Sequence, residues 1–259
     1  MKANPFKALV LLLVGLPGGP GEVRAQVLFP PDSAALPPPD LPVLLIPGWS
    51  KGSEDLMPLK ERLLRDGWPE DWVLALDFRD PVGSNEVHAG EIRDALEALL
   101  DRTGTRQVDA VAHSMGGLAL WTLLQEEGGR IPIRRVVFLG SPLQGTLMAH
   151  LAWGEGGEEM RPESEFLERL EAGPDPTHWV EALTIRTPLD LTVVPVSGAT
   201  LPGMGDRLVC CPTHQGLQDH EETFRVLRDF LLFGRRGPPT QDSGEGPALR
   251  WPDFFTGRR

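Results

Sequence analysis

Hydrophobic and polar positions follow two different patterns between residues 43 and 233. Mostly apolar runs of four or five residues occur at 43–46, 72–76, 108–112 and 136–139, and weaker runs follow at 183–186 and 208–210. Continuous apolar runs of this length are typical of strands in a parallel sheet that is covered on both faces. We therefore predict a sheet built from these six segments.

The segments between the apolar runs show the spacing of helices that bury one side. In 91–102, the apolar residues recur at the i, i+3, i+4, i+7, i+8 positions of such a helix, and Gly104 follows as a predicted stop. Phe224, Leu227 and Leu231 mark a last helix in the same way. Alternation of strands and helices over about 190 residues predicts an α/β fold with a mostly parallel, doubly wound sheet.

The segment 149–176 interrupts this alternation. It is rich in Gly, Glu and Pro and contains one short helical pattern at 165–170. We interpret it as an insertion over the edge of the sheet. The apolar residues Leu151, Trp153 and Phe166 lie among acidic ones, which is typical of a partial lid. A surface excursion without a gating role is the alternative.

The two ends of the chain differ from this domain, which spans 43–233. Lys2 and Lys7 accompany the apolar run 8–16, and small residues lead to Ala25, so we predict a signal peptide over 1–25 and a secreted or periplasmic protein. The run is far shorter than the ~20 residues that span a bilayer. An uncleaved leader that tethers the protein to a membrane is the alternative. A Pro-rich lead covers 26–42, and a loose tail covers 234–259.

Charge and cysteine content exclude several classes of partner. The formal charge of −12 argues against a nucleic-acid-binding face and against electrostatic docking on anionic lipid. Transient contact with a neutral lipid interface stays open, because apolar surface makes that contact. The adjacent Cys210 and Cys211 are either reduced or joined in a vicinal disulfide, and they lack the second thiol pair of a zinc site. We predict no metal and no cofactor.

The strongest chemical signal is the segment 108–118, Val-Asp-Ala-Val-Ala-His-Ser-Met-Gly-Gly-Leu. A strand ends at Ala112, a tight turn presents Ser114, and a helix begins at about Met115. This order is a nucleophile elbow, in which a strained strand-to-helix turn exposes a serine hydroxyl. Ala112 and Gly116 are small enough for the backbone to fold back closely, so Ser114 is the predicted nucleophile.

A nucleophilic serine needs a base and an acid that orients the base, and in this fold they follow in the order Ser, Asp, His. His214 lies between the last weak strand and the last helix, where the base belongs, and His220 is the alternative. Asp190 directly follows the run 183–186. Asp206 is its rival, although its glycine-rich surroundings indicate a turn.

An oxyanion hole needs two backbone N–H donors. The residue after the nucleophile, Met115, supplies one of them. The loop after the first strand, Ile46-Pro-Gly-Trp, places Trp49 as the second donor, and Gly48 lets that loop approach the substrate.

Taken together, several blocks resemble the bacterial secreted lipases and esterases of the α/β-hydrolase superfamily, near the small triacylglycerol lipases. They are the loop at 46–49, the segments 103–117, 139–146 and 160–170, Asp190 with 194–195, and His214 with 216–217. Pro47 departs from the family's His-Gly-x loop. The resemblance implies the α/β-hydrolase fold, a Ser114, Asp190, His214 triad and oxyanion donors at Trp49 and Met115.

The expected function is hydrolysis of carboxylic esters through an acyl-enzyme, with a small-molecule or lipid ester, such as an acyl-glycerol, as substrate. Three alternatives remain at this point. They are an acyltransferase, a thioesterase or amidase on the same fold, and a non-catalytic binding protein. The sequence specifies neither acyl chain length nor oligomeric state.

Overall fold

The structure is a computed structural model that describes residues 36–234. The predicted signal peptide 1–25, residues 26–35 of the Pro-rich lead and the tail beyond Gly234 lie outside the described residues. Within the described range, none of the helices combines the length and apolar character needed to cross a bilayer.

A single sheet of six parallel strands forms the centre of the domain, in the order β2-β1-β3-β4-β5-β6. The strands are β1 (Val43–Ile46), β2 (Val73–Ala75), β3 (Val108–His113), β4 (Ile133–Leu139), β5 (Glu181–Arg186) and β6 (Gly205–Leu208). Because all six strands run the same way, their carboxyl ends meet at one edge, where the loops after β3, β5 and β6 come together.

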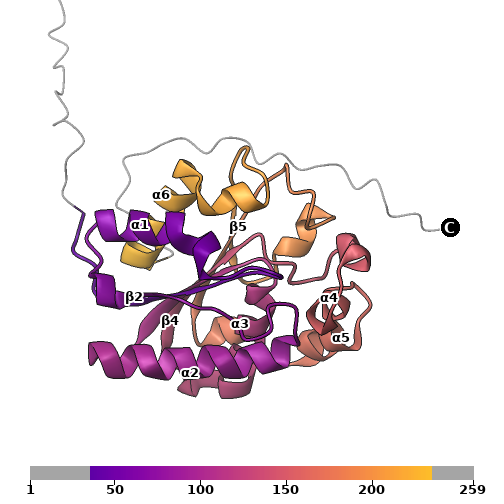
Figure 1. The fold of residues 1–259 in the computed structure, drawn as a ribbon, viewed down its shortest axis with the longest axis horizontal. Helices are drawn as coiled ribbons and strands as arrows, with labels where there is room; N and C mark the ends of the chain where they lie inside the picture. The colour runs from indigo at the N-terminus through magenta and orange to yellow at the C-terminus, as the bar shows by residue number, and fades with distance from the viewer. Residues whose placement is uncertain (1–35, 235–259) are drawn as a thin grey trace, which may run out of the picture. The chain divides into compact units, whose positions relative to one another are not determined.

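Helices cover both faces of this sheet (Figure 1). The helices are α1 (Met57–Arg65), α2 (Asn85–Thr103), α3 (Gly116–Glu127), α4 (Glu155–Glu159), α5 (Glu165–Ala172) and α6 (Glu221–Phe233). In Figure 1, α1 and α6 lie above the sheet and α2 and α3 below it. Successive residues of β1 alternate between these layers, with Val43 and Leu45 in the core under α1 and α6 and Leu44 and Ile46 in the core over α2 and α3.

Five of the six predicted strands and the four predicted helical segments, which correspond to α2, α3, α5 and α6, are confirmed, with shifts of a few residues at their ends. Helix α2 begins at Asn85, earlier than the apolar stripe indicates, because Ser84 caps it and its hydroxyl accepts a hydrogen bond from the Glu86 N–H at 3.2 Å. It ends at Gly104, whose φ of +67° is the left-handed conformation expected of a helix stop.

The prediction of a strand at 208–210 is wrong, because β6 ends at Leu208. Asp206 therefore lies in a strand rather than in a turn. Its carboxylate accepts two hydrogen bonds from the Arg186 guanidinium on the neighbouring β5, at 2.9 and 2.6 Å. Pairing with β5, rather than an apolar run, determines where this edge strand lies.

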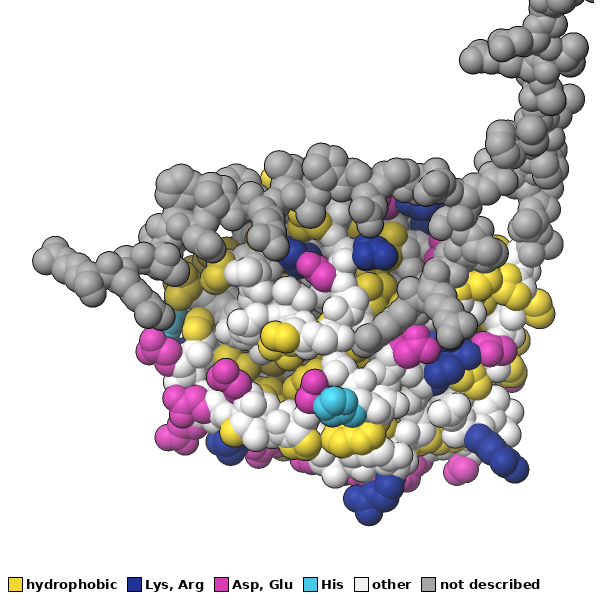
Figure 2. All heavy atoms as spheres, turned by 180° about the vertical axis from the view of Figure 1, so that it is seen from behind, with side chains coloured by type: hydrophobic (Ala, Val, Ile, Leu, Met, Phe, Trp, Pro, Cys, Tyr) yellow, Lys and Arg dark blue, Asp and Glu magenta, His cyan; other side chains and the backbone are white. Residues whose placement is uncertain are grey.

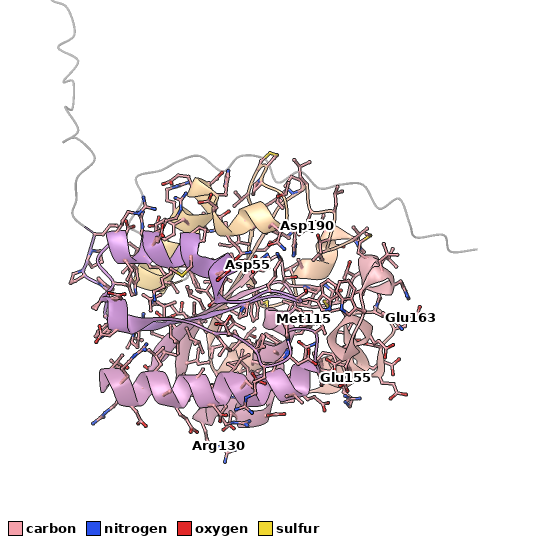
Figure 3. The ribbon with its side chains drawn as sticks, in the orientation of Figure 1. Asp55, Met115, Arg130, Glu155, Glu163 and Asp190 are labelled. Carbon is pink, nitrogen blue, oxygen red and sulfur yellow. A yellow bond between two sulfur atoms is a disulfide. The ribbon has the colours of Figure 1, made fainter. Side chains whose placement is uncertain are left out.

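The segment 149–176 contains α4 and α5. In Figure 2, which shows the domain from behind, acidic and hydrophobic side chains lie next to one another at the edge that carries these helices. The acidic side chains exposed along this segment include Glu155, Glu158, Glu163, Glu165, Glu168 and Glu171. Glu155 and Glu163 lie at the outer side of the segment in Figure 3.

Candidate active site

The turn between β3 and α3 has the backbone of a strained elbow. Ser114 has a φ of +52°, a conformation that non-glycine residues rarely adopt, and its N–H donates to the Leu139 carbonyl at 2.9 Å. A Cβ on Gly116 would overlap the carbonyl oxygen of Pro47, and one on Gly117 would overlap the Ser141 hydroxyl. The glycines after the serine are therefore required by close packing of the backbone.

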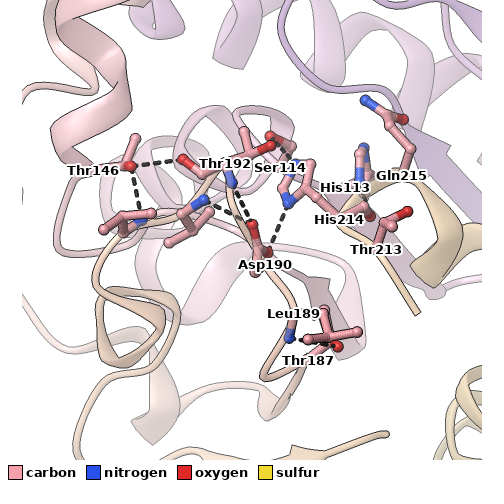
Figure 4. Close-up of polar contacts among 12 residues, drawn as sticks. His113, Ser114, Thr146, Thr187, Leu189, Asp190, Thr192, Thr213, His214 and Gln215 are labelled. Atoms are coloured by element: carbon pink, nitrogen blue, oxygen red, sulfur yellow. Dashed lines mark hydrogen bonds and ion pairs between the residues drawn. The ribbon is translucent and has the colours of Figure 1, made fainter. Parts of the chain in front are cut away.

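Ser114, His214 and Asp190 form one continuous chain of hydrogen bonds (Figure 4). His214 Nε2 lies 3.0 Å from Ser114 Oγ, and His214 Nδ1 lies 2.8 Å from Asp190 Oδ2. All three residues are buried, with exposed fractions of 7%, 4% and 3% for Ser114, His214 and Asp190. This geometry is consistent with a catalytic triad.

The Asp190 carboxylate is held on both of its oxygens. Oδ1 accepts from the N–H groups of Thr192 and Val193, each at 2.8 Å, which turns Oδ2 toward His214. Burial alone would raise the pKa of Asp190, but the His214 ring and these two N–H groups outweigh it and hold that pKa below its ordinary value. An ionised Asp190 keeps the proton of a neutral His214 on Nδ1, so that Nε2 can accept the serine proton.

Neither of the rival residues is placed in this chain. The Asp206 carboxylate is occupied by Arg186, and His220 is the cap of α6. Of the four candidates for acid and base, the structure brings only Asp190 and His214 to Ser114, and these are the two that the order of elements along the chain favoured.

A cavity of about 420 Å³ opens beside Ser114 and His214. Its lining is mostly apolar and includes Ala149, Leu151 and Trp153 from the insertion. This volume lies within the range that pockets for small organic ligands occupy. The insertion thus forms one wall of the space in which a substrate would meet the serine.

Comparisons with known proteins agree with this architecture. A family model described as alpha/beta hydrolase fold matches residues 42–164. A lipase B from Aspergillus fumigatus superposes with a TM-score of 0.64 at 18% identity, over 77% of this chain but only 58% of that one. The mature lipase BlEst2 from Bacillus licheniformis has a TM-score of 0.65 at 15% identity, over 76% and 94% of the two chains.

A pyrethroid hydrolase, PytH, has a TM-score of 0.52 at 16% identity, over 74% of this chain and 97% of its own. The chain has the α/β-hydrolase fold. The predicted fold class is confirmed. The predicted likeness to lipases is supported as a distant structural similarity to bacterial and fungal lipases. At these identities the likeness concerns the fold alone, so the chemistry of this chain is argued from its own site.

The loop after β1 packs against the candidate site. A Cβ on Gly48 would come within 2.8 Å of the Ser114 Cβ, so the loop packs directly on the serine. The Trp49 ring lines the cavity, donates from Nε1 to the Trp153 carbonyl at 3.0 Å, and contacts the Trp153 ring with centroids 4.3 Å apart. Loop and insertion therefore meet through this tryptophan pair.

The two predicted oxyanion donors belong to the β1 loop and to the elbow itself. Met115 follows Ser114 directly and is fully buried near the start of α3, as Figure 3 shows. Among the described residues, neither the Met115 N–H nor the Trp49 N–H has a hydrogen-bond partner. The assignment of these two N–H groups to an oxyanion hole remains a prediction.

His113, the residue before the nucleophile, also contacts the site. Its Nε2 lies 3.3 Å from the His214 carbonyl oxygen, and the two imidazoles are 4.8 Å apart. The alternation of side chains along β3 places the His113 side chain under the loop that carries His214. Sequence reasoning missed this contact because nothing in the local pattern shows where a loop 100 residues later will lie.

The remaining candidate groups lie outside the triad. Cys210 and Cys211 form a disulfide in the segment between β6 and His214. No cluster of three or more His, Cys, Asp or Glu side chains in residues 36–234 is arranged to hold a metal ion.

Proposed function

We propose that this α/β-hydrolase is a serine hydrolase that cleaves carboxylic esters. The observation that carries the proposal is the unbroken chain Asp190–His214–Ser114 at the wall of an apolar cavity. A buried serine hydroxyl within hydrogen-bond distance of a neutral imidazole, which a carboxylate orients, has the geometry that nucleophilic acyl transfer requires.

The reaction proceeds in two halves. In the first, the Ser114 Oγ–H proton moves to His214 Nε2 while Oγ bonds to the ester carbonyl carbon. The N–H groups of Trp49 and Met115 bind the resulting oxyanion. The bond to the alkoxy group then breaks, and His214 returns its proton to the departing alcohol.

In the second half, water takes the place of the alcohol. His214 removes a proton from the water as its oxygen bonds to the acyl carbon. The acyl–Ser114 bond breaks, the proton returns to Oγ, and the carboxylic acid leaves. Asp190 stays ionised throughout and stabilises the imidazolium that forms twice in each cycle.

An apolar acyl chain is the substrate feature that the cavity and its mouth favour. Leu151, Trp153 and Leu191 line it and are all more than half exposed. Large apolar side chains that gather at the mouth of one site are typical of a surface that meets apolar ligands or lipid. The charge of −12 disfavours anionic lipid, so we propose neutral lipid or acyl-glycerol esters, met at a lipid interface.

The decisive experiment compares the wild type with Ser114→Ala. A fluorophosphonate probe and p-nitrophenyl esters of increasing chain length measure labelling and turnover. We expect Ser114→Ala to lose labelling and to lower kcat by about 10⁴-fold or more. Ser141→Ala is the matched control, since Ser141 is fully buried and its hydroxyl has no hydrogen-bond partner in the described part of the chain. A folded wild type that the probe leaves unlabelled would contradict the proposal.

A further inference from the structure

His113 occupies the junction of the three parts that make the site. It is 1% exposed and directly precedes Ser114 at the end of β3. Its Nδ1 would lie 3.2 Å from a Cβ on Gly48, so the ring packs on the β1 loop that carries Trp49. Its Nε2 faces the backbone of the loop that carries His214.

The partners of His113 fix which of its nitrogens carries the proton. The His214 carbonyl oxygen can only accept a hydrogen bond, so the Nε2 that faces it must donate. In the neutral ring, Nδ1 is then the acceptor, and Gln218 Nε2 lies 3.2 Å from it. Gln218 in turn lies 3.1 Å from the Gln215 Oε1, so the ring is oriented from both sides.

Two consecutive residues of the elbow therefore hold two ends of one histidine. Ser114 contacts the ring of His214, and His113 contacts its carbonyl group. On the basis of the proposed function, we propose that His113 is a positioning residue whose Nε2–H fixes the His214 backbone, so that the His214 ring meets Ser114 in line. Displacement of a reacting group by about 1 Å can cost on the order of 100-fold in rate.

This role requires that His113 stay neutral while His214 gains and loses a proton. Burial, together with repulsion from His214, lowers the pKa of His113 to about 3. The carboxylates of Asp190 and Asp55 act in the opposite direction but do not compensate for the burial. His113 therefore stays neutral and holds one tautomer while His214 gains and loses its proton.

Two amide substitutions separate positioning from packing. Gln at 113 carries an amide N–H about where histidine has Nε2, whereas Asn carries its amide where histidine has Nδ1 and cannot reach the His214 carbonyl. We expect His113→Asn to lower kcat on p-nitrophenyl butyrate about 10- to 100-fold with KM changed less than about threefold. His113→Gln should stay within about threefold of the wild type, and probe labelling of Ser114 should slow in parallel with kcat.

Trp68→Phe serves as the matched control. It also removes a ring N–H that donates to a backbone carbonyl, from Trp68 Nε1 to the Leu41 oxygen at 3.2 Å, outside the triad. It should lower the Tm without changing kcat. Equal losses of kcat in His113→Asn and His113→Gln, or a loss of Tm alone in His113→Asn, would overturn the positioning role.

Two further results complete the test on the full chain. If His113→Asn does not fold, Gln218→Leu removes the partner of Nδ1 instead, and an unchanged kcat in that variant would overturn the proposal. A folded wild type without esterase activity or labelling would refute the proposed function itself. Labelling and turnover of the wild type with no difference among the His113 variants would refute the positioning role alone.

Discussion

The elbow and the insertion face the same cavity, but different forces hold them in place. Around Ser114, glycines allow backbones to meet, and the residues of the turn are buried almost completely. The insertion instead exposes its tip, where Leu151 and Trp153 are 76% and 62% accessible. It is fixed at its base by polar contacts to the start of α2.

Glu159 makes the contacts of this base. Its carboxylate accepts from Ser84 Oγ at 2.8 Å and from the backbone N–H and side-chain amide of Asn85 at 2.7 Å each. A carboxylate at a helix N-terminus also has a favourable interaction with the helix dipole. Steric fit thus sets the position of the nucleophile, whereas one buried carboxylate sets the position of the wall opposite it.

The largest expected effect concerns the buried histidine on the elbow side. Because the pKa of His113 is about 3 in the folded protein and 6.5 in the unfolded chain, the unfolded state binds more protons between these values. The contribution of neutral, buried His113 to the free energy of unfolding is fully present above pH 6.5 and is lost as the pH falls toward 3. Between pH 7 and 4, urea unfolding should show about 3 kcal/mol more destabilisation for the wild type than for His113→Gln. Parallel pH curves for the two proteins would contradict this.

Gly116→Ala tests steric fit at the elbow. The added Cβ meets the backbone of Pro47, which cannot move without shifting the β1 loop. We expect a loss of about 2–4 kcal/mol in the free energy of unfolding, measured in denaturant. Gly90→Ala in α2 is the control, because a Cβ there meets nothing within 4 Å and should stabilise by about 0.5–1 kcal/mol. If Gly116→Ala is as stable as Gly90→Ala, the packing of the elbow tolerates a side chain.

Glu159→Gln tests the anchor of the insertion. The amide keeps one acceptor but places an N–H against groups that themselves donate, so we expect a loss of about 1–3 kcal/mol. The insertion should also become more sensitive to limited proteolysis. Glu158→Gln is the neighbouring control, since the side chain of Glu158 is 67% exposed and its surface ion pair with Arg161 contributes little. If both variants behave alike, Glu159 is not the anchor.

The smallest effect on stability is expected at the exposed rim. Leu191→Ser should change the free energy of unfolding by less than about 0.5 kcal/mol. Hydrolysis of a dissolved short-chain ester should be unchanged, whereas hydrolysis of an emulsified long-chain ester should fall several-fold, because contact with the lipid surface is weakened. Val87→Ser removes a similarly exposed side chain on α2 and should leave both rates unchanged. An equal loss on both substrates for Leu191→Ser would place Leu191 in substrate binding rather than in interface contact.

Features that depend on local patterns could be predicted from the amino-acid sequence alone. Apolar runs located five of the six strands, because a buried parallel strand must be apolar on both faces. The elbow could be recognised because its turn imposes small residues next to Ser114. The order of elements then placed Asp190 and His214, since loops after parallel strands share one edge of the sheet.

Contacts that join distant segments through single polar groups depend on the folded arrangement and could not be predicted from the sequence. Strand β6 lies where Asp206 meets Arg186, and no apolar pattern marks that pair. The bond from His113 to the His214 carbonyl spans 101 positions, and the anchor from Glu159 to Ser84 spans 75. Such bonds depend on how the packed layers orient each side chain, and a one-dimensional pattern of polar and apolar residues does not contain that information.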